Sequence, residues 1–135
     1  MKRATTSSCL LFFALLIAQP VFAQTEAGKQ ERIIVNDSLA KVGETVWSAK
    51  GCVSCHTIGK SGIIAPDLAG LFERRTVAWV RSLLRDPDAL LERDDTAKAL
   101  LQRYNNLRMP NLKLSDTEIE AVMHYMAAHS RAKEK

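Results

Sequence analysis

The stretch Cys52-Val53-Ser54-Cys55-His56 decides how the rest of this chain is interpreted. Cys-x-x-Cys-His is the attachment motif for a c-type haem. Two thiols three positions apart on one helical turn can each form a thioether with a haem vinyl group, and the next residue then places an imidazole under the iron. His56 would give Nε2 to the metal while its Nδ1–H meets an acceptor that fixes the ring. The motif therefore predicts one covalently bound haem c, held by Cys52, Cys55 and His56.

Two other kinds of site use Cys-x-x-Cys, and both fit this sequence poorly. A thioredoxin-like disulfide belongs to a βαβ pattern, and no alternating apolar strand flanks Cys52. A zinc site needs four ligands. The third cysteine, Cys9, lies in a segment that we expect to be removed, and the other histidines are distant in the sequence. The haem interpretation is therefore favoured.

The N-terminus has the pattern of a secretory signal peptide. Lys2 and Arg3 precede an apolar run over residues 9–18, and Val21-Phe22-Ala23 is an A-x-A-like cleavage site. The apolar run is too short to remain as a membrane-spanning helix. We therefore expect cleavage after residue 23, export to the periplasm and no membrane anchor, which agrees with haem attachment outside the bacterial cytoplasm.

Cleavage would leave a chain of the size of one small domain. Removing 23 of the 135 residues leaves 112, enough for a single core. It also lowers the number of Lys and Arg from 19 to 17 against 15 Asp and Glu, so the net charge becomes +2. With no basic run interleaved with aromatics, a nucleic-acid partner is not expected. The predicted organisation is a signal peptide (1–23), a leader (24–37), a domain (38–130) and a polar tail (131–135).

Both ends of the predicted domain carry helical patterns. Ser38 is expected to cap a helix that runs to about Lys50, with an apolar face formed by Leu39, Val42, Val46 and Trp47. Near the C-terminus, Ser115-Asp116-Thr117-Glu118 is a capping box. The helix that follows it is expected to reach about His129, with an apolar stripe formed by Ile119, Val122, Met123, Met126 and Ala127.

The middle of the chain is predicted to contain shorter helices joined by loops. Residues 57–72 are rich in Gly and Pro and are expected to form a loop. A helix is expected over residues 76–85, where a Thr caps its start and an Asp-Pro pair follows its end. Another is expected over residues 94–104, with a short helical turn at 89–91. Because no segment has the alternation of a strand, the predicted fold class is all-α.

With these elements in place, the chain resembles a small class I cytochrome c of bacteria, His/Met ligated, over about residues 39–128. Members have an N-terminal helix with a Gly, an aromatic residue and a second Gly before the haem motif, and Gly43, Trp47 and Gly51 fit this pattern. The resemblance implies about four to five helices around one haem, with the N- and C-terminal helices crossing. Gly43 would allow the close approach, and Trp47 would fill the crossing.

A second tract carries the same resemblance. Members have Pro-x-Leu-x-Gly-Leu-Phe and then a basic residue, and residues 66–72 followed by Arg74 are similar. By that resemblance the Pro66 carbonyl accepts the Nδ1–H of His56, Leu68 packs on the haem face, and Arg74 pairs with a propionate.

The sixth ligand of the iron is predicted to be Met109. It stands before Pro110, which favours an extended loop, and family members place a Met-Pro shortly before the last helix. Met123 and Met126 lie on the apolar stripe of that helix, where filling the core is the expected role. The rival ligands His124 and His129 lie on the same helix.

Further residues around the haem are implied only by the resemblance. Related proteins use an aromatic donor toward a propionate, which points to Trp79, and Tyr104 with Asn105 or Asn106 would also line the haem. Residues 76–104 depart from the short eukaryotic pattern. They look like those of bacterial subgroups found beside copper-containing oxidases and nitrogen-oxide reductases.

The function expected from these features is single-electron transfer in a respiratory chain. The haem would cycle between Fe(II) and Fe(III), and the partners would be a respiratory donor and a terminal oxidase or reductase. We expect a monomer that is not itself an enzyme, because no further acid-base group is predicted in a loop facing the iron. Two alternatives stay open: a gas-binding sensor in which Met109 dissociates easily, and the cytochrome subunit of a periplasmic oxidoreductase.

Overall fold

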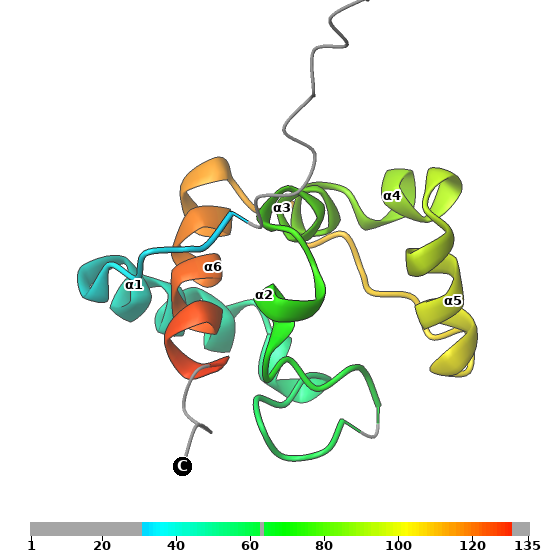
Figure 1. Cartoon of the computed structure of the whole chain (residues 1–135), viewed down its shortest axis with the longest axis horizontal. Helices are drawn as coiled ribbons and strands as arrows, with labels where there is room; N and C mark the ends of the chain where they lie inside the picture. Colours follow the sequence, from blue (N-terminus) through cyan, green and yellow to red (C-terminus); the bar gives the residue numbers. More distant parts are fainter. Residues whose placement is uncertain (1–30, 63, 131–135) are drawn as a thin grey trace, which may run out of the picture.

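The computed structural model describes residues 31–62 and 64–130, and this part of the chain is helical without strands (Figure 1). The elements are α1 (Asp37–Ala49), a 3-10 turn (Cys52–Ser54), α2 (Leu71–Arg74), α3 (Val77–Arg85), α4 (Pro87–Arg93), α5 (Asp95–Arg103) and α6 (Asp116–Ser130). The all-α prediction is confirmed. The predicted signal peptide, residues 24–30 of the leader and the polar tail lie outside the described residues. Within the described ranges, no helix combines the length and apolar character needed to cross a membrane.

All the α-helices of the described residues except α2 begin at a side-chain cap, and the sequence analysis identified two of these caps, Thr76 and Ser115. Thr76 caps α3, and Asp94 caps α5 by accepting the Ala97 amide at 2.8 Å. The predicted capping box is present at α6, because Ser115 and Glu118 each accept the other's backbone N–H. The cap of α1 is Asn36 rather than Ser38, so this helix begins earlier than expected.

Two short helices bring the number of α-helices in the described residues to six, above the four to five expected. The left-handed Gly70 turns the chain into α2, at the end of the segment predicted as a loop. Asp86 ends α3 and caps α4 by accepting the Ala89 amide. Pro87 stands in the first turn of α4, where its missing N–H removes no helical hydrogen bond. The Asp-Pro pair therefore starts a helix as well as ending one.

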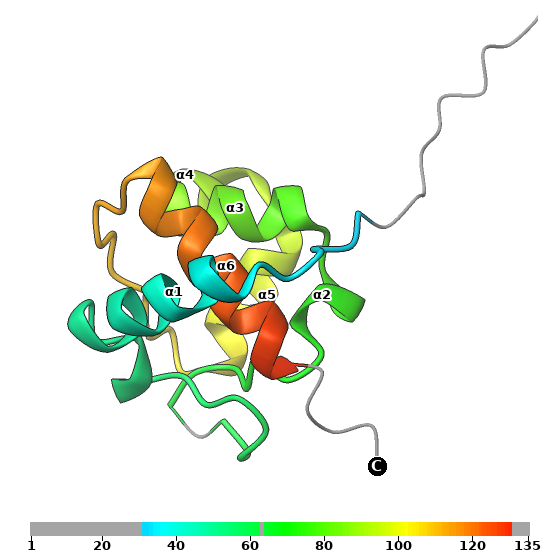
Figure 2. The same cartoon turned by 90° about the vertical axis from the view of Figure 1, so that its left-hand side faces the viewer.

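The crossing of α1 over α6 brings the two backbones into contact (Figure 2). A Cβ added to Gly43 would lie 2.0 Å from the carbonyl oxygen of Ala121 and 2.8 Å from Cβ of Tyr125. Only glycine fits such a contact. Trp47, one turn further along α1, packs against Tyr125 with ring centroids 5.5 Å apart. The predicted crossing, with Gly43 at the contact and Trp47 filling it, is confirmed.

This contact also determines which face of α1 is buried, and here the sequence-based prediction is partly wrong. The buried residues are Ala40, Gly43 and Trp47, whereas Leu39 is exposed and Val42 is 53% exposed. The small residues Ala40 and Gly43 allow the closest approach to α6. The helix is therefore oriented by steric fit at the crossing, and Leu39 and Val42 face outward.

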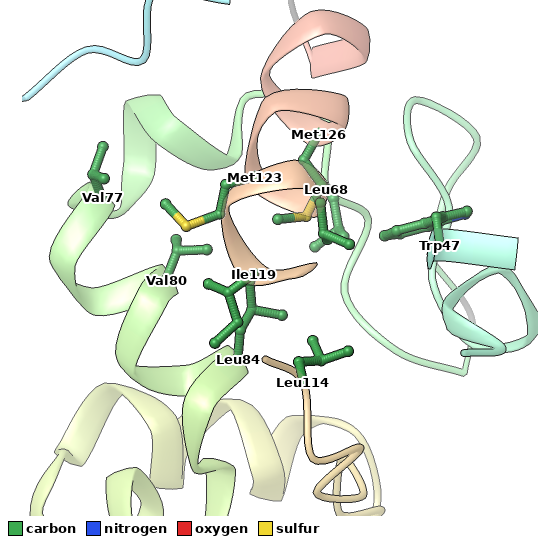
Figure 3. Packing of buried hydrophobic residues seen from close by; sticks show 10 residues of the cluster. Trp47, Leu68, Val77, Val80, Leu84, Leu114, Ile119, Met123 and Met126 are labelled. Carbon is green, nitrogen blue, oxygen red and sulfur yellow. The ribbon is translucent and has the colours of Figure 1, made fainter. Parts of the chain in front are cut away.

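The core is centred on α6, which lies between α3 and α1 (Figure 3). Ile119, Met123 and Met126 of α6 are at most 2% exposed. They pack with α3 residues on one side and with Trp47 on the other. Helices α4 and α5 lie at the end of the molecule opposite to α1 (Figure 1).

Candidate haem site

A largely apolar cavity of about 290 Å³ lies where the Cys-x-x-Cys-His turn faces α5 and the chain that leads to α6. Seven of the residues predicted for the site line it: Cys52, Cys55, His56, Pro66, Trp79, Tyr104 and Met109. A smaller cavity of about 60 Å³ continues toward the core. It is lined by Leu68 and again by His56, Trp79 and Met109. The residues predicted for the site therefore lie around one pair of cavities, except Arg74, Asn105 and Asn106, which line neither cavity.

The proximal side is organised by a tight turn. Gly51 adopts φ +75°, a left-handed conformation that favours glycine, and the 3-10 turn Cys52–Ser54 follows it. The His56 amide then donates to the Cys52 carbonyl at 2.9 Å. Neither Cys52 nor Cys55 forms a disulfide within the described residues. Both thiols and the imidazole line one cavity wall, as covalent attachment of a haem requires.

The pKa of the Cys52 thiol does not favour thiol–disulfide exchange. Burial raises the pKa of the Cys52 thiol, and the neighbouring Cys55 raises it further against an opposing backbone hydrogen bond. Redox-active Cys-x-x-Cys motifs instead lower the pKa of a thiol. Within the described ranges, no group of three or more His, Cys, Asp or Glu side chains is arranged to hold a metal ion. The zinc alternative therefore receives no support.

The imidazole of His56 is held in one orientation. Its Nδ1 lies 2.9 Å from the carbonyl oxygen of Pro66, the contact implied by the resemblance. Burial lowers the pKa of His56, and the hydrogen bond to Pro66 opposes this only in part. A neutral ring that donates from Nδ1 has its lone pair on Nε2, which is the form that binds iron.

Met109 lines both cavities, and hydrogen bonds hold the loop on both sides of it. Arg108, just before it, donates to the Asp88 carboxylate of α4 at 2.7 Å. On the other side, the Asn111 carboxamide accepts the Lys113 amide before the capping box begins α6. Met126 also lines the smaller cavity, whereas Met123 is buried in the core.

The two histidines of α6 make other contacts. His124 accepts the backbone N–H of Asn36 through Nδ1 at 3.1 Å, which ties the start of α1 to α6. His129 donates from Nδ1 to the Tyr125 carbonyl at 2.9 Å. Both lie outside the two cavities, so their arrangement does not favour either as an iron ligand.

Arg74 lies outside both cavities as well. Its guanidinium donates to the backbone carbonyls of Ala69 and Asp67. In this arrangement it holds the chain that follows Pro66. Pairing of Arg74 with a propionate stays a prediction.

Trp79 supplies the observation that best tests the fit of a haem. Its indole Nε1–H is buried and has no hydrogen-bond partner among the described residues. An orphaned buried N–H is costly unless it meets an acceptor. Because Trp79 lines both cavities, a bound group that carries an acceptor oxygen would satisfy it. The donor set and the apolar walls therefore fit a haem.

The far wall of the larger cavity includes the predicted Tyr104. The rest of this wall consists of residues that the sequence analysis did not select for the site. They come mostly from α4, α5 and the turn after α5: Pro87, Leu91, Ala97, Leu100, Leu101 and Leu107. The available signal was the helical spacing of Ala97, Leu100 and Leu101 in the helix predicted over residues 94–104. A face that is apolar at helical spacing looks the same whether it packs against a protein core or against a cofactor.

Comparison with known proteins agrees with this geometry. Residues 40–130 match the family model described as Cytochrome c. A cytochrome c from Rhodothermus marinus has the same fold, with a TM-score of 0.65 and 22% identity, over 76% of this chain and 90% of that one. The cytochrome c domain of a Pseudomonas putida protein is 35% identical, with a TM-score of 0.57, over 65% of this chain and 87% of that one. Cytochrome c oxidase subunit 2 of Bacillus subtilis (strain 168) is 28% identical over 116 residues, and the match spans only 30% of its length.

Proposed function

Since the chain belongs to the cytochrome c family, we propose that it is a periplasmic single-electron carrier whose haem iron is held between His56 and Met109. It is a class I c-type cytochrome, and its haem c is bound covalently through Cys52 and Cys55. The observation that carries the proposed ligation is that His56 and Met109 line the same two cavities.

The protein's own residues would adapt the haem to electron transfer, while the haem supplies the one-electron Fe(II)/Fe(III) couple. Burial keeps the His56 imidazole neutral, and the Pro66 carbonyl keeps it oriented. Met109 would supply the second protein ligand of the iron, and a thioether ligand would raise the reduction potential. The apolar walls exclude water and so limit the reorganisation that accompanies each electron transfer. This role needs no catalytic residue.

The partners that we propose are a respiratory donor and a terminal oxidase or reductase. The relationship to a subunit 2 of cytochrome c oxidase supports an oxidase as the acceptor. Lys50 lines the haem cavity and pairs with Glu118 at 3.1 Å, so part of the positive charge near the site is already neutralised. Together with a net charge of only +2 after cleavage, this favours docking without strong long-range steering.

The proposed organisation is a cleaved signal peptide (1–23), a leader (24–37), the cytochrome domain (38–130) and a polar tail (131–135). We expect the protein exported from a bacterial host to have the mass of residues 24–135 plus one haem. The haem should stay with the protein in denaturing electrophoresis, and Cys52→Ala should weaken its attachment. Intact-mass spectrometry and haem staining measure both. A haem that acidified solvent extracts, or a mass that includes residues 1–23, would contradict the corresponding part of the proposal.

A further inference from the structure

We propose that Asp67 is a positioning residue for the proximal ligand: its carboxylate clamps the two ends of the loop between His56 and Pro66, and so holds the Pro66 carbonyl on His56 Nδ1. The inference rests on the proposed role of His56 as an iron ligand and adds what determines the strength of that ligand. Asp67 itself lies outside the cavities. It acts through Pro66, its neighbour in the chain.

The carboxylate of Asp67 accepts four hydrogen bonds, two at each oxygen. Oδ1 accepts the amides of Gly59 at 3.0 Å and Ala69 at 2.8 Å. Oδ2 accepts the Thr57 hydroxyl at 2.6 Å and the Lys60 amide at 2.8 Å. Three of these four donors belong to the chain just after His56, so one side chain connects both ends of the loop.

A second set of bonds fixes the backbone of residues 66–69. The Leu68 amide donates to the Thr57 carbonyl at 2.8 Å, beside the bond between His56 and Pro66. Each carbonyl of this segment has a donor: His56 for Pro66, Arg74 for Asp67 and Ala69, and Ser130 of α6 for Leu68 at 2.9 Å. Since hydrogen bonds hold the backbone of residues 67–69, the Pro66 carbonyl has little freedom to move away from the imidazole.

The pattern of donors explains why a carboxylate stands at this position. Asparagine has one acceptor oxygen, and its NH2 group would face two N–H or O–H donors in place of the other oxygen. Burial alone would raise the pKa of the Asp67 carboxyl, but the hydrogen bonds from Thr57, Ala69, Gly59 and Lys60 outweigh it and hold the pKa well below its usual range. Asp67 is therefore ionised and acts only as an acceptor at physiological pH.

The clamp has a consequence for the reduction potential. A firm hydrogen bond from Nδ1–H to a carbonyl makes the imidazole a stronger electron donor and favours Fe(III). A looser clamp would weaken this bond, favour Fe(II) and raise the potential. Loss of a negative charge also raises the potential, so the charge effect has to be separated from the effect of position.

Three variants of the holoprotein make this separation. Asp67→Asn replaces one of the two acceptor oxygens with an NH2 group and also removes one negative charge. Thr57→Val removes the shortest of the four hydrogen bonds without changing any charge. Asp95→Asn removes one charge at a side chain that is 98% exposed and pairs only within α5 through Lys98, so it serves as the matched control.

The measurements are the exchange rate of the His56 Nδ1 proton by NMR and the potential by optical redox titration. In Asp67→Asn we expect at least about tenfold faster exchange and a higher potential than in Asp95→Asn. The expected change in the ratio of oxidised to reduced protein is roughly threefold to tenfold, where tenfold equals about 59 mV for one electron. Thr57→Val should change both quantities in the same direction by less.

Wild-type exchange rates in both clamp variants, with an unchanged potential in Thr57→Val, would overturn the role of Asp67. If the Asp67→Asn variant does not bind haem, the exchange rate and the potential of Thr57→Val alone test the role of Asp67. Failure of the proposed function has a different signature. In that case the ring signals of His56 would show no paramagnetic shift in the ferric wild-type protein, because His56 would not be a ligand.

Discussion

Replacing Met109 with Ala is expected to lower the reduction potential of the holoprotein and to open the iron to carbon monoxide. The thioether that favours Fe(II) would be lost, and alanine cannot reach the metal. Axial ligands adjust haem potentials over about 0.8 V, so a decrease on the order of 0.2 V is expected. Redox titration measures the potential, and mixing the ferrous protein with carbon monoxide measures access to the iron.

Met123→Leu provides the control for this experiment. Met123 is buried in the core, 1% exposed, and leucine keeps its apolar volume. It should leave the spectrum and the potential unchanged. If Met109→Ala left both unchanged, the sixth ligand would be another residue. Met126 would then be tested first, because it lines the smaller cavity, and His124 next.

The largest expected effect on stability comes from Gly43→Ala. In an ordinary helix interior this substitution stabilises by roughly 0.5–1 kcal/mol. Here the new methyl group would lie 2.0 Å from the Ala121 carbonyl oxygen, so α1 and α6 would have to separate. We expect destabilisation by about 3 kcal/mol or more, at the upper end of the cost of overpacking.

Denaturant unfolding of the holoprotein measures this effect. Val42→Ala is the matched control, because Val42 is in the same helix on its exposed side. It should change the free energy of unfolding by much less than Gly43→Ala. A Gly43→Ala variant as stable as the wild type, or more stable, would show that the two helices do not meet at this position.

Local chemistry explains which elements were predictable from sequence. The capping box at Ser115 and the cap at Thr76 depend on residues within one turn of the chain, and both were identified correctly. The motif at Cys52 likewise needs only its own spacing. The approach of α1 to α6 was anticipated from Gly43 because a resemblance supplied the partner helix.

The errors arose where distant contacts decide between local alternatives. The apolar residues Leu39 and Val42 formed a plausible buried face, but the fit of Gly43 against Ala121 turned them outward. The hydrogen bonds of Arg74 to the carbonyls of Ala69 and Asp67 were not predictable either, because these carbonyls become available only when the loop has folded. The pairing of Arg74 with a propionate stays a prediction. The far wall of the cavity, apart from Tyr104, was missed for a similar reason: a helix face that lines a cofactor has the same pattern as one that lines a core.

The proposed electron-carrier function depends most directly on how firmly Met109 holds the iron in the unmutated protein. The measurement is the reaction of the purified ferrous holoprotein with carbon monoxide at neutral pH, followed by its absorption spectrum. We predict a six-coordinate, low-spin haem in both oxidation states that binds carbon monoxide slowly or not at all. Rapid and stoichiometric binding would contradict the carrier function and would indicate a gas-binding protein in its place.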